Sequence, residues 1–234
     1  MKLEIKQENI ETFKSYIEAL DKLSTEMLIS FEEDKLTMRV DYSGCVIGQI
    51  TLKKDFFSIF EGEGTFNVFL SDIVSCTKKI KSVILLETDQ GALTISTEKT
   101  SFKTPLIADE KEYPNMPELT FDGKVVLTAE NYSNMISTIS AIKPDTIKLC
   151  HEKTRFMAKT QKNQREVSTE VETVELDSIE EQVFIDFDHI TKFKTKTTND
   201  IKLFIKKDAP LIISTENENS KLEFMIAPRV EEGY

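Results

Sequence analysis

The stretch Leu93-Thr-Ile-Ser-Thr-Glu98 occurs a second time, with one change, as Leu211-Ile-Ile-Ser-Thr-Glu216. The two copies lie 118 residues apart, which is close to half of the 234-residue chain. Self-similarity at a fixed offset is typical of an architecture in which one structural unit is duplicated. The stretch therefore suggests that the chain is built from two related halves.

Two further pairs of segments recur in the same order along the chain. Glu8-Asn-Ile10 matches Glu130-Asn-Tyr132 at an offset of 122, and Phe69-Leu-Ser-Asp-Ile73 matches Asp186-Phe-Asp-His-Ile190 at an offset of 117. Three matches in order arise by chance much less often than one. The sequence thus predicts two similar halves, each with a strand, a helix, several strands, a second helix and further strands.

Helices and strands follow from the spacing of apolar residues. We assign helices to 8–23, 70–81, 128–142 and 186–197, the first with an apolar stripe at Ile10, Phe13, Ile17 and Leu20. Strand-like runs occur at 31–36, 46–52, 83–86, 94–97, 125–127, 201–205 and 222–226. Sheets of short strands with two helices per half predict an α+β protein.

Residues 108–122 separate the two halves. This stretch holds two prolines and five acidic residues. Proline cannot donate a backbone hydrogen bond, so it disfavours a helix interior or a central strand. We therefore expect an N-terminal domain at 1–107, an extended connecting loop at 108–122 and a C-terminal domain at 123–234.

The composition limits the class of protein. With 39% hydrophobic residues the chain can build sizeable cores, and 41 acidic against 30 basic side chains give a net charge of -11. Cys45, Cys76 and Cys150 lie far apart in no metal-binding spacing, which indicates reduced thiols. The N-terminus lacks the apolar run of a signal peptide, and no stretch approaches the length of a membrane span. We expect a soluble, intracellular protein.

Catalytic patterns are missing from the sequence. His151 and His189 are the only histidines, and neither lies in a cluster at metal-ligand spacing. Cys150 and His151 are neighbours in a strand-like run, so their side chains alternate between faces and do not form a nucleophile–base pair. Gly62-Glu-Gly64 lacks the third glycine of a dinucleotide loop. We expect no enzyme, no metal and no cofactor; a hydrolase with unrecognised carboxylates is the remaining enzymatic alternative.

Lysines gather at the ends of two expected helices. They are Lys78, Lys79 and Lys81 in one helix, and Lys192, Lys194 and Lys196 in the other. Cations near a helix C-terminus complement the helix dipole, which is one explanation. The other is a pair of equivalent basic patches, one per half, that contact phosphates without reading bases. The pattern by itself leaves both explanations open.

The C-terminal segment Leu222-Glu-Phe-Met-Ile-Ala-Pro-Arg-Val-Glu-Glu232 closely resembles the ending of the sliding clamps of archaea and eukaryotes, the proliferating-cell-nuclear-antigen (PCNA) family. Val40-Asp-Tyr-Ser43, Gln49-Ile-Thr-Leu52 and Ala209-Pro-Leu211 are similar to family segments in family order. The resemblance implies a ring of three subunits, each with two similar clamp-type domains. Helices would line the hole, which holds duplex DNA, and sheets would form the outside.

The resemblance also implies residues that face DNA without reading its sequence. They are Lys14, Lys22, Lys78, Lys79, Lys81, Lys143, Lys192, Lys194 and Lys196. The chain departs from the family in the helix at 128–142, which has no Lys or Arg before Lys143. The inner face is therefore less basic than the family implies, which is consistent with weak DNA contact or with a sister subunit that supplies more charge.

Two more sites follow from the resemblance. A pocket for short hydrophobic peptides of the clamp loader, DNA polymerase, ligase and flap nuclease would comprise Val40, Cys45, Val46, Ile47, Met116, Pro117, Leu119, Pro210, Met225, Ala227 and Pro228. The subunit interface would pair an edge strand near 101–107, with Lys99 and Lys103, with one near 170–176, with Glu170, Glu172 and Glu175. Opposite charges on the two edges favour such pairing.

The sequence therefore predicts a DNA sliding clamp, a processivity factor without catalysis that encircles duplex DNA as a homotrimer and tethers replication and repair enzymes. We expect it with the chromosomal DNA and not at a membrane. One subunit of a heterotrimeric ring is the first alternative, because the third helix has no Lys or Arg. A monomeric β-rich binding module with no role on DNA is the second.

Overall fold

The computed structural model describes residues 1–78, 80, 84–89, 91–97, 99–108, 113–117, 119–121, 123–152, 154–177, 180–194, 196 and 198–229. The chain divides into two compact units, Met1–Asn115 with Asn217–Leu222, and Met116–Glu216 with Glu223–Tyr234. The boundary after Asn115 lies within the stretch 108–122. The sequence did not predict that Asn217–Leu222 belongs to the first unit, where the Lys53 N–H donates to the Asn219 carbonyl at 2.9 Å.

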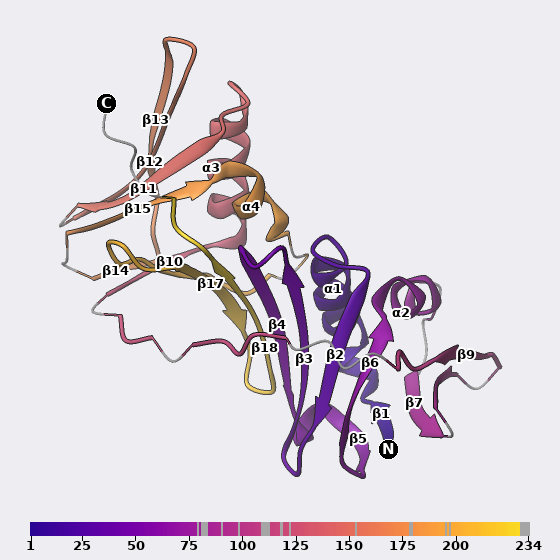
Figure 1. The fold of residues 1–234 in the computed structure, drawn as a ribbon. Helices are drawn as coiled ribbons and strands as arrows, with labels where there is room; N and C mark the ends of the chain where they lie inside the picture. Colours follow the sequence, from indigo (N-terminus) through magenta and orange to yellow (C-terminus); the bar gives the residue numbers. More distant parts are fainter. Residues whose placement is uncertain are drawn as a thin grey trace. The chain divides into compact units, whose positions relative to one another are not determined.

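Among the described residues, the first unit contains nine strands and two α-helices (Figure 1). In chain order these are β1 (Lys2–Ile5), α1 (Ile10–Leu20), β2 (Glu26–Phe31), β3 (Lys35–Tyr42), β4 (Val46–Lys53), β5 (Phe57–Glu61), β6 (Gly64–Phe69), α2 (Leu70–Thr77), β7 (Ile84–Asp89), β8 (Ala92–Ser96) and β9 (Ser101–Pro105). Short 3-10 helices at Gln7–Asn9 and Lys54–Phe56 precede α1 and β5. The strands pair in the orders β5-β1-β7-β8-β9 and β4-β3-β2-β6.

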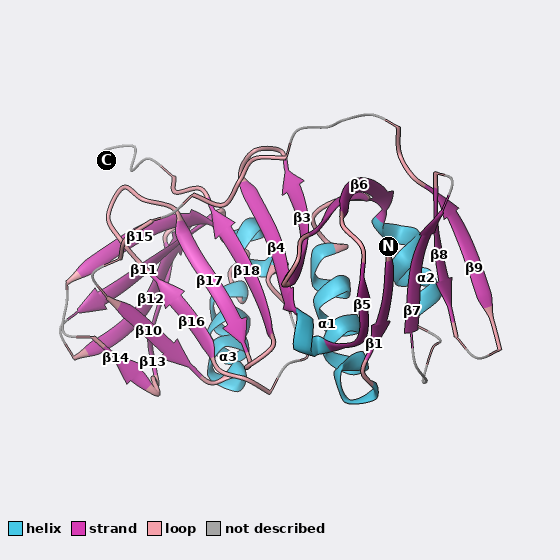
Figure 2. Cartoon of the chain, turned by 90° about the horizontal axis from the view of Figure 1, so that it is seen from below, coloured by secondary structure: helices cyan, strands magenta, loops and turns pink. Residues whose placement is uncertain are grey.

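Nine of the described strands and two α-helices follow in the second unit, the last strand beginning at Ser220 in the first unit (Figure 2). They are β10 (Lys124–Leu127), α3 (Ala129–Ser140), β11 (Thr146–Glu152), β12 (Arg155–Lys162), β13 (Arg165–Val171), β14 (Glu175–Leu176), β15 (Glu181–Asp186), α4 (Phe187–Lys192), β16 (Ile201–Phe204), β17 (Leu211–Glu216) and β18 (Ser220–Ile226). The strands pair in the orders β14-β10-β16-β17-β18 and β13-β12-β11-β15.

The two units have the same order of elements and the same sheet topology. Each strand and helix of the first unit has a counterpart in the second, from β1 with β10 to β9 with β18, and the strand orders correspond position by position. The structure thus confirms the predicted α+β class and the predicted duplication.

The helices form because one face of each carries apolar side chains that a sheet can cover. In α1, Phe13, Ile17 and Leu20 are fully buried, and in α3 Tyr132 and Ile139 are buried in the same way. The α3 helix also begins at a favourable cap, because the Thr128 side chain accepts a hydrogen bond from the Asn131 N–H at 3.0 Å. The opposite faces of the helices are left for polar and charged residues.

All four expected helices are longer in the prediction than in the structure. The helix predicted at 70–81 ends at Thr77, and the one predicted at 186–197 covers only Phe187–Lys192. In α4 the reason is Phe193, which leaves the helical conformation (φ -72°, ψ 88°) and packs its ring edge-on against Tyr132 and Phe224. Burial of this aromatic side chain in the core thus competes with continuation of the helix.

One predicted strand is a turn. The run at 31–36 spans the end of β2 and the start of β3, and the Glu32 N–H donates to the Lys35 carbonyl at 3.0 Å across the turn. The exposed residues Glu32, Glu33 and Asp34 give no apolar alternation, and they form the connection of a tight hairpin. The prediction of a strand there was wrong.

Candidate functional site

Two of the lysines expected to face DNA lie on helices and are ion-paired. Lys14 Nζ lies 2.8 Å from Glu11 Oε1 on α1, and Lys192 Nζ lies 3.2 Å from Asp188 Oδ2 on α4. Each lysine therefore has a carboxylate of its own helix as a partner. A phosphate that approached either lysine would compete with that carboxylate.

The other described lysines of this set follow the C-terminal ends of the helices. Lys22 follows α1, Lys78 follows α2, Lys143 follows α3, and Lys194 and Lys196 follow α4, and all five are exposed. Lys79 and Lys81, which were also expected to face DNA, lie outside the described residues. Lysine at these positions complements the negative end of the helix dipole. Contact with phosphates would accordingly be made at helix ends rather than along helix sides.

The helices themselves are acidic within the bounds that the structure gives them. They carry two lysines, Lys14 and Lys192, and five carboxylates, on Glu11, Glu18, Asp72, Glu130 and Asp188. The α3 helix has no Lys or Arg, as the sequence already indicated. A duplex beside these helices would therefore meet little net attraction from the helix sides.

One sheet of each unit ends in an edge strand, and the two edge strands carry charges of opposite sign. Among the described residues, β9 pairs only with β8, and β13 pairs only with β12. The expected edge strand at 170–176 is not one strand, because β13 ends at Val171 and β14 belongs to the other sheet of the unit. The edge strand is therefore Arg165–Val171, which ends one sheet and includes Glu166 as well as Glu170.

The side chains of β9 divide between the two faces of its sheet. Thr104 is buried and its Oγ1 donates to Asp72 Oδ2 of α2 at 2.7 Å, so this face is the one that α2 covers. Phe102 is two residues away and shares the helix-covered face, although its side chain is 40% exposed. Lys103 consequently lies on the opposite face, and it is exposed.

The edge strand β13 divides in the same way. Val167 and Thr169 are half-buried and Val171 is buried, whereas Glu166 and Glu170 are exposed. Both edges thus have an uncovered face with charged residues, lysine on β9 and glutamate on β13.

The remaining interface candidates lie near these edges but not on them. Lys99 precedes β9, and Glu172 follows β13, where its carbonyl accepts from Asn131 Nδ2 at 3.0 Å. Glu175 lies on β14 and forms an ion pair with Lys124 Nζ at 3.0 Å.

The residues expected to form a peptide pocket differ in accessibility. In the first unit Val40, Val46 and Ile47 are buried, and Cys45 is half-buried in the turn before β4. The members in the second unit are more accessible: Met116, Pro210, Met225, Ala227 and Pro228 are half-buried, and Pro117 and Leu119 are exposed. Exposed apolar side chains on a connecting segment are available for contact with a partner.

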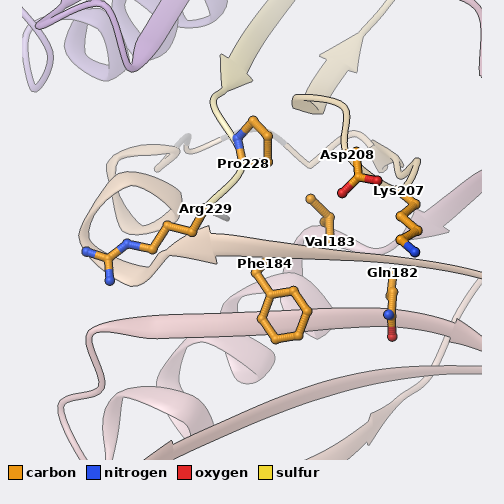
Figure 3. Close-up of a pocket in the computed structure, with 7 residues that line it drawn as sticks. All are labelled: Gln182, Val183, Phe184, Lys207, Asp208, Pro228 and Arg229. Carbon is orange, nitrogen blue, oxygen red and sulfur yellow. The ribbon is translucent and has the colours of Figure 1, made fainter. Parts of the chain in front are cut away.

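A pocket of about 260 Å³ is present in the second unit, and only one of its residues was predicted. It is lined by Gln182, Val183, Phe184, Lys207, Asp208, Pro228 and Arg229, of which Pro228 belongs to the expected set. Figure 3 shows Val183 on one side of β15 and Gln182 and Phe184 on the other. The other lining residues come from a loop and from the segment after β18.

The segment after β18 is fixed to β15 by hydrogen bonds of Arg229. Its N–H donates to the Phe184 carbonyl at 2.7 Å, Nη2 lies 2.7 Å from Asp186 Oδ2, and Nη1 donates to Thr146 Oγ1 at 3.0 Å. Pro228, which has no N–H, sits opposite Ile185. Pro228 and Arg229 stood out in the sequence as part of the C-terminal motif. Their pairing with β15, which forms this side of the pocket, could not be recognised there.

Groups suited to catalysis or to metal binding are sparse. Within the described ranges, no three His, Cys, Asp or Glu side chains are grouped so that they could hold a metal ion. Burial, and then the charge of Asp72, raise the pKa of the Cys76 thiol, which is the reverse of activation. His151 is buried. The helices described here are all too short or too polar to cross a bilayer.

Comparison with known proteins finds relatives along almost the whole chain. No family model matches the sequence. It is 27% identical over 256 residues to DNA polymerase sliding clamp 1 of Thermococcus kodakarensis and 26% identical over 258 residues to the clamp of Pyrococcus furiosus, covering 99% of this chain and all of each relative.

Solved structures have the same fold. A. fulgidus PCNA with the C-terminal region of FEN-1 bound matches with a TM-score of 0.86 at 20% identity, covering 99% of both chains. The PCNA2–PCNA3 complex of Sulfolobus tokodaii matches with a TM-score of 0.83 at 20% identity, covering 98% of this chain and 99% of that one. The chain is therefore similar along almost its whole length to DNA polymerase sliding clamps of archaea, and it has the fold of PCNA.

Proposed function

We propose that three copies of this chain close a ring around duplex DNA and act as a processivity factor for DNA polymerase. The observation that carries this proposal is the pair of edge strands, β9 in one unit and β13 in the other, with opposite charges. Because the two edges differ, the contact between copies is head-to-tail, and such a contact generates a ring when its rotation closes. The ring has no catalysis of its own.

When β9 of one copy pairs with β13 of the next, side chains of matching character meet on each face of the combined sheet. Phe102 of one copy lies on the helix-covered face, as do Val167 and Thr169 of the next copy. On the other face, Lys103 lies near Glu166 and Glu170. Backbone hydrogen bonds supply the affinity, and the side chains on the two faces select the partner edge.

Inside the ring, DNA is held by enclosure more than by attraction. Among the described residues, the candidate contacts at the helix ends are Lys22, Lys78, Lys143, Lys194 and Lys196, and the helix sides are acidic. Contacts with phosphates are independent of sequence and permit sliding. Weak contacts therefore suit a protein that must move along the duplex and remain enclosed around it.

The accessible residues of the connecting segment and of the second unit provide a docking site for partner proteins. Leu119 and Pro117 present apolar surface, and the pocket at Pro228 and Phe184 lies in the same unit. A short peptide with a few hydrophobic anchors suits such a site. Clamp loader, DNA polymerase, ligase and flap nuclease are the partners that we propose, at the chromosomal DNA.

The mass of the pure chain in solution tests the ring. Three times 26.8 kDa gives about 80 kDa for a closed homotrimer. A mass near 80 kDa by light scattering, at low and at high salt, is the expected result. A mass of 26.8 kDa under both conditions would contradict the homotrimer.

A heteromeric ring is the second candidate. The observation that favours it is α3, which carries Glu130 and no cation, so that a homotrimeric ring would have three such helices. A sister subunit with a basic helix would supply the missing charge. Recovery of a ring only after a sister subunit is added to the monomeric chain would support this second candidate.

A further inference from the structure

The connecting segment, which we define as residues 113–121 without Glu118, is fixed at its first end to the sheet of the first unit. Arg39 Nη1 on β3 donates to Asn115 Oδ1 at 2.7 Å. Arg39 Nε donates to Gln49 Oε1 at 3.0 Å, and Gln49 lies directly opposite Arg39 on β4. Tyr113, two residues earlier in the segment, is only 7% exposed. One guanidinium thus links the segment to two strands.

The other end of the connecting segment is fixed within the second unit. The Phe121 ring packs on the Phe204 ring of β16, with centroids 5.6 Å apart. Lys206 Nζ donates to the Thr120 carbonyl at 3.3 Å. The span between the two fixed ends is therefore short. It holds Leu119, whose side chain is 38% exposed.

The fixed ends matter because a docking segment that is ordered in advance loses less entropy when it binds. Fixing the backbone of a residue costs conformational entropy, so a few loose residues can offset much of the gain from an apolar contact. Arg39 is suited to hold the segment because a guanidinium presents several donors in a rigid, planar arrangement. Partial burial lowers the pKa of Arg39, and a guanidinium is not deprotonated in proteins.

We propose that Arg39 is a positioning residue for partner binding: through Asn115 it holds the connecting segment in place, so that Leu119 is presented to a docking peptide in an ordered form. This inference rests on the proposed function, in which the segment forms part of the docking site. Arg39 itself does not need to touch the peptide. Its effect is carried by the single hydrogen bond to Asn115.

The test measures peptide affinity and segment mobility in the full chain. The probe is a synthetic peptide of the C-terminal region of FEN-1, the segment bound to A. fulgidus PCNA. We expect Arg39→Ala and Asn115→Ala each to raise Kd about tenfold, and the double variant to be no weaker than Arg39→Ala alone, since residues of one interaction are not additive. Asn115→Asp, which keeps an acceptor for Arg39, should bind like the parent.

A control and a second measurement separate positioning from general damage. Lys35→Ala removes a cation from the same strand, where Lys35 pairs with Glu32 at 3.2 Å, and should leave Kd unchanged. Without peptide, hydrogen exchange should become faster at 113–121 in Arg39→Ala and Asn115→Ala, but not in the strands β3 and β4. Asn115 is exposed, so its replacement tests the inference even if Arg39→Ala fails to fold.

The possible failures can be told apart. If the parent chain does not bind the peptide, the proposed docking function is wrong and the role of Arg39 falls with it. If the parent binds and both single variants bind equally well, only the role of Arg39 is refuted. Additive losses in the double variant would also overturn the inference, because they would show that Arg39 and Asn115 act independently.

Discussion

Reversal of one charge on β9 tests how the ring closes. Lys103 is exposed on the face that no helix covers, and the proposed partner edge presents Glu166 and Glu170 on the corresponding face. An exposed pair of opposite charges across two strands contributes about 0.2–1 kcal/mol, and like charges destabilise by a similar amount. Lys103→Glu should therefore cost about 1 kcal/mol at each interface.

A closed homotrimer repeats that interface three times, so the cost adds up. The sum of about 3 kcal/mol corresponds to roughly a hundredfold weaker assembly of the ring. Light scattering over a dilution series measures this shift as the concentration at which the mass falls from about 80 kDa, three times the 26.8 kDa of one chain. The combined variant Lys103→Glu with Glu170→Lys should restore much of the assembly, because each copy provides both edges.

Salt and a matched control make the test specific. Screening shortens the Debye length from about 10 Å at 0.1 M to about 3 Å at 1 M, so the difference between variant and parent should almost vanish at 1 M salt. Lys35→Glu makes the same change of net charge at the start of β3 and should assemble like the parent. The reasoning is refuted if Lys103→Glu assembles normally, or if its defect is the same at both salt concentrations.

Three further predictions concern the inner face, the docking site and the stability at high pH. Lys78→Ala with Lys194→Ala should reduce polymerase stimulation several-fold at unchanged ring mass; full stimulation would remove these lysines from the set that faces DNA. Leu119→Ala with Pro228→Ala should raise the Kd for the FEN-1 peptide about tenfold or more in calorimetry, since two apolar contacts are lost. Equal affinity of the variant and the parent would refute the docking site. Burial, and then the charges of nearby carboxylates, raise the pKa of Tyr113 from 10.0 to about 12. Between these two pH values Tyr113 loses its proton in the unfolded chain but keeps it in the folded chain. The free energy of unfolding should therefore fall as the pH rises through this range. Tyr113→Phe should make that fall smaller in urea titrations, and an unchanged slope would contradict the shift.

The duplication was predictable because the residues that repeat are the ones that the core requires. Leu93 and Leu211 are fully buried at equivalent places in β8 and β17, and Ile95 and Ile213 are buried beside them. Core positions tolerate few substitutions because interiors are close-packed, so a pattern persists there when the surface has changed. The same reason explains why the match was limited to short stretches.

The ends of the helices could not be predicted from local sequence. Phe193 ends α4 because its ring finds partners on Tyr132, 61 residues earlier, and on Phe224, 31 residues later. Nothing in the neighbouring residues marks that choice, and Lys194 and Lys196 continue the polar pattern of a helix. Such a conflict between local preference and long-range packing is decided by the tertiary structure.

The sites were predictable to different degrees for a similar reason. Pro228 and Leu119 stood out because an apolar residue on a tail or a connection has no place in a regular strand pattern. The opposite charges of the two edges could be seen in the sequence. That β13 is the last strand of its sheet could not, because the position of a strand in a sheet depends on which other strands pair with it. Phe184 and Lys207 reach the pocket from segments with no motif.

The distribution of charge in this chain favours ring closure over DNA attraction as the main determinant of retention. Lysines on the helix sides, Lys14 and Lys192, are ion-paired, and those past the helix ends partly compensate the helix dipole. Only a fraction of their charge is therefore available to release counterions from DNA, and a protein that neutralises few phosphates has low affinity and weak dependence on salt. What keeps such a protein on a duplex is then the stability of the contact that we propose between β9 of one copy and β13 of the next. A substitution on the edge strands should consequently reduce retention on DNA more than a substitution of any single lysine of the inner face.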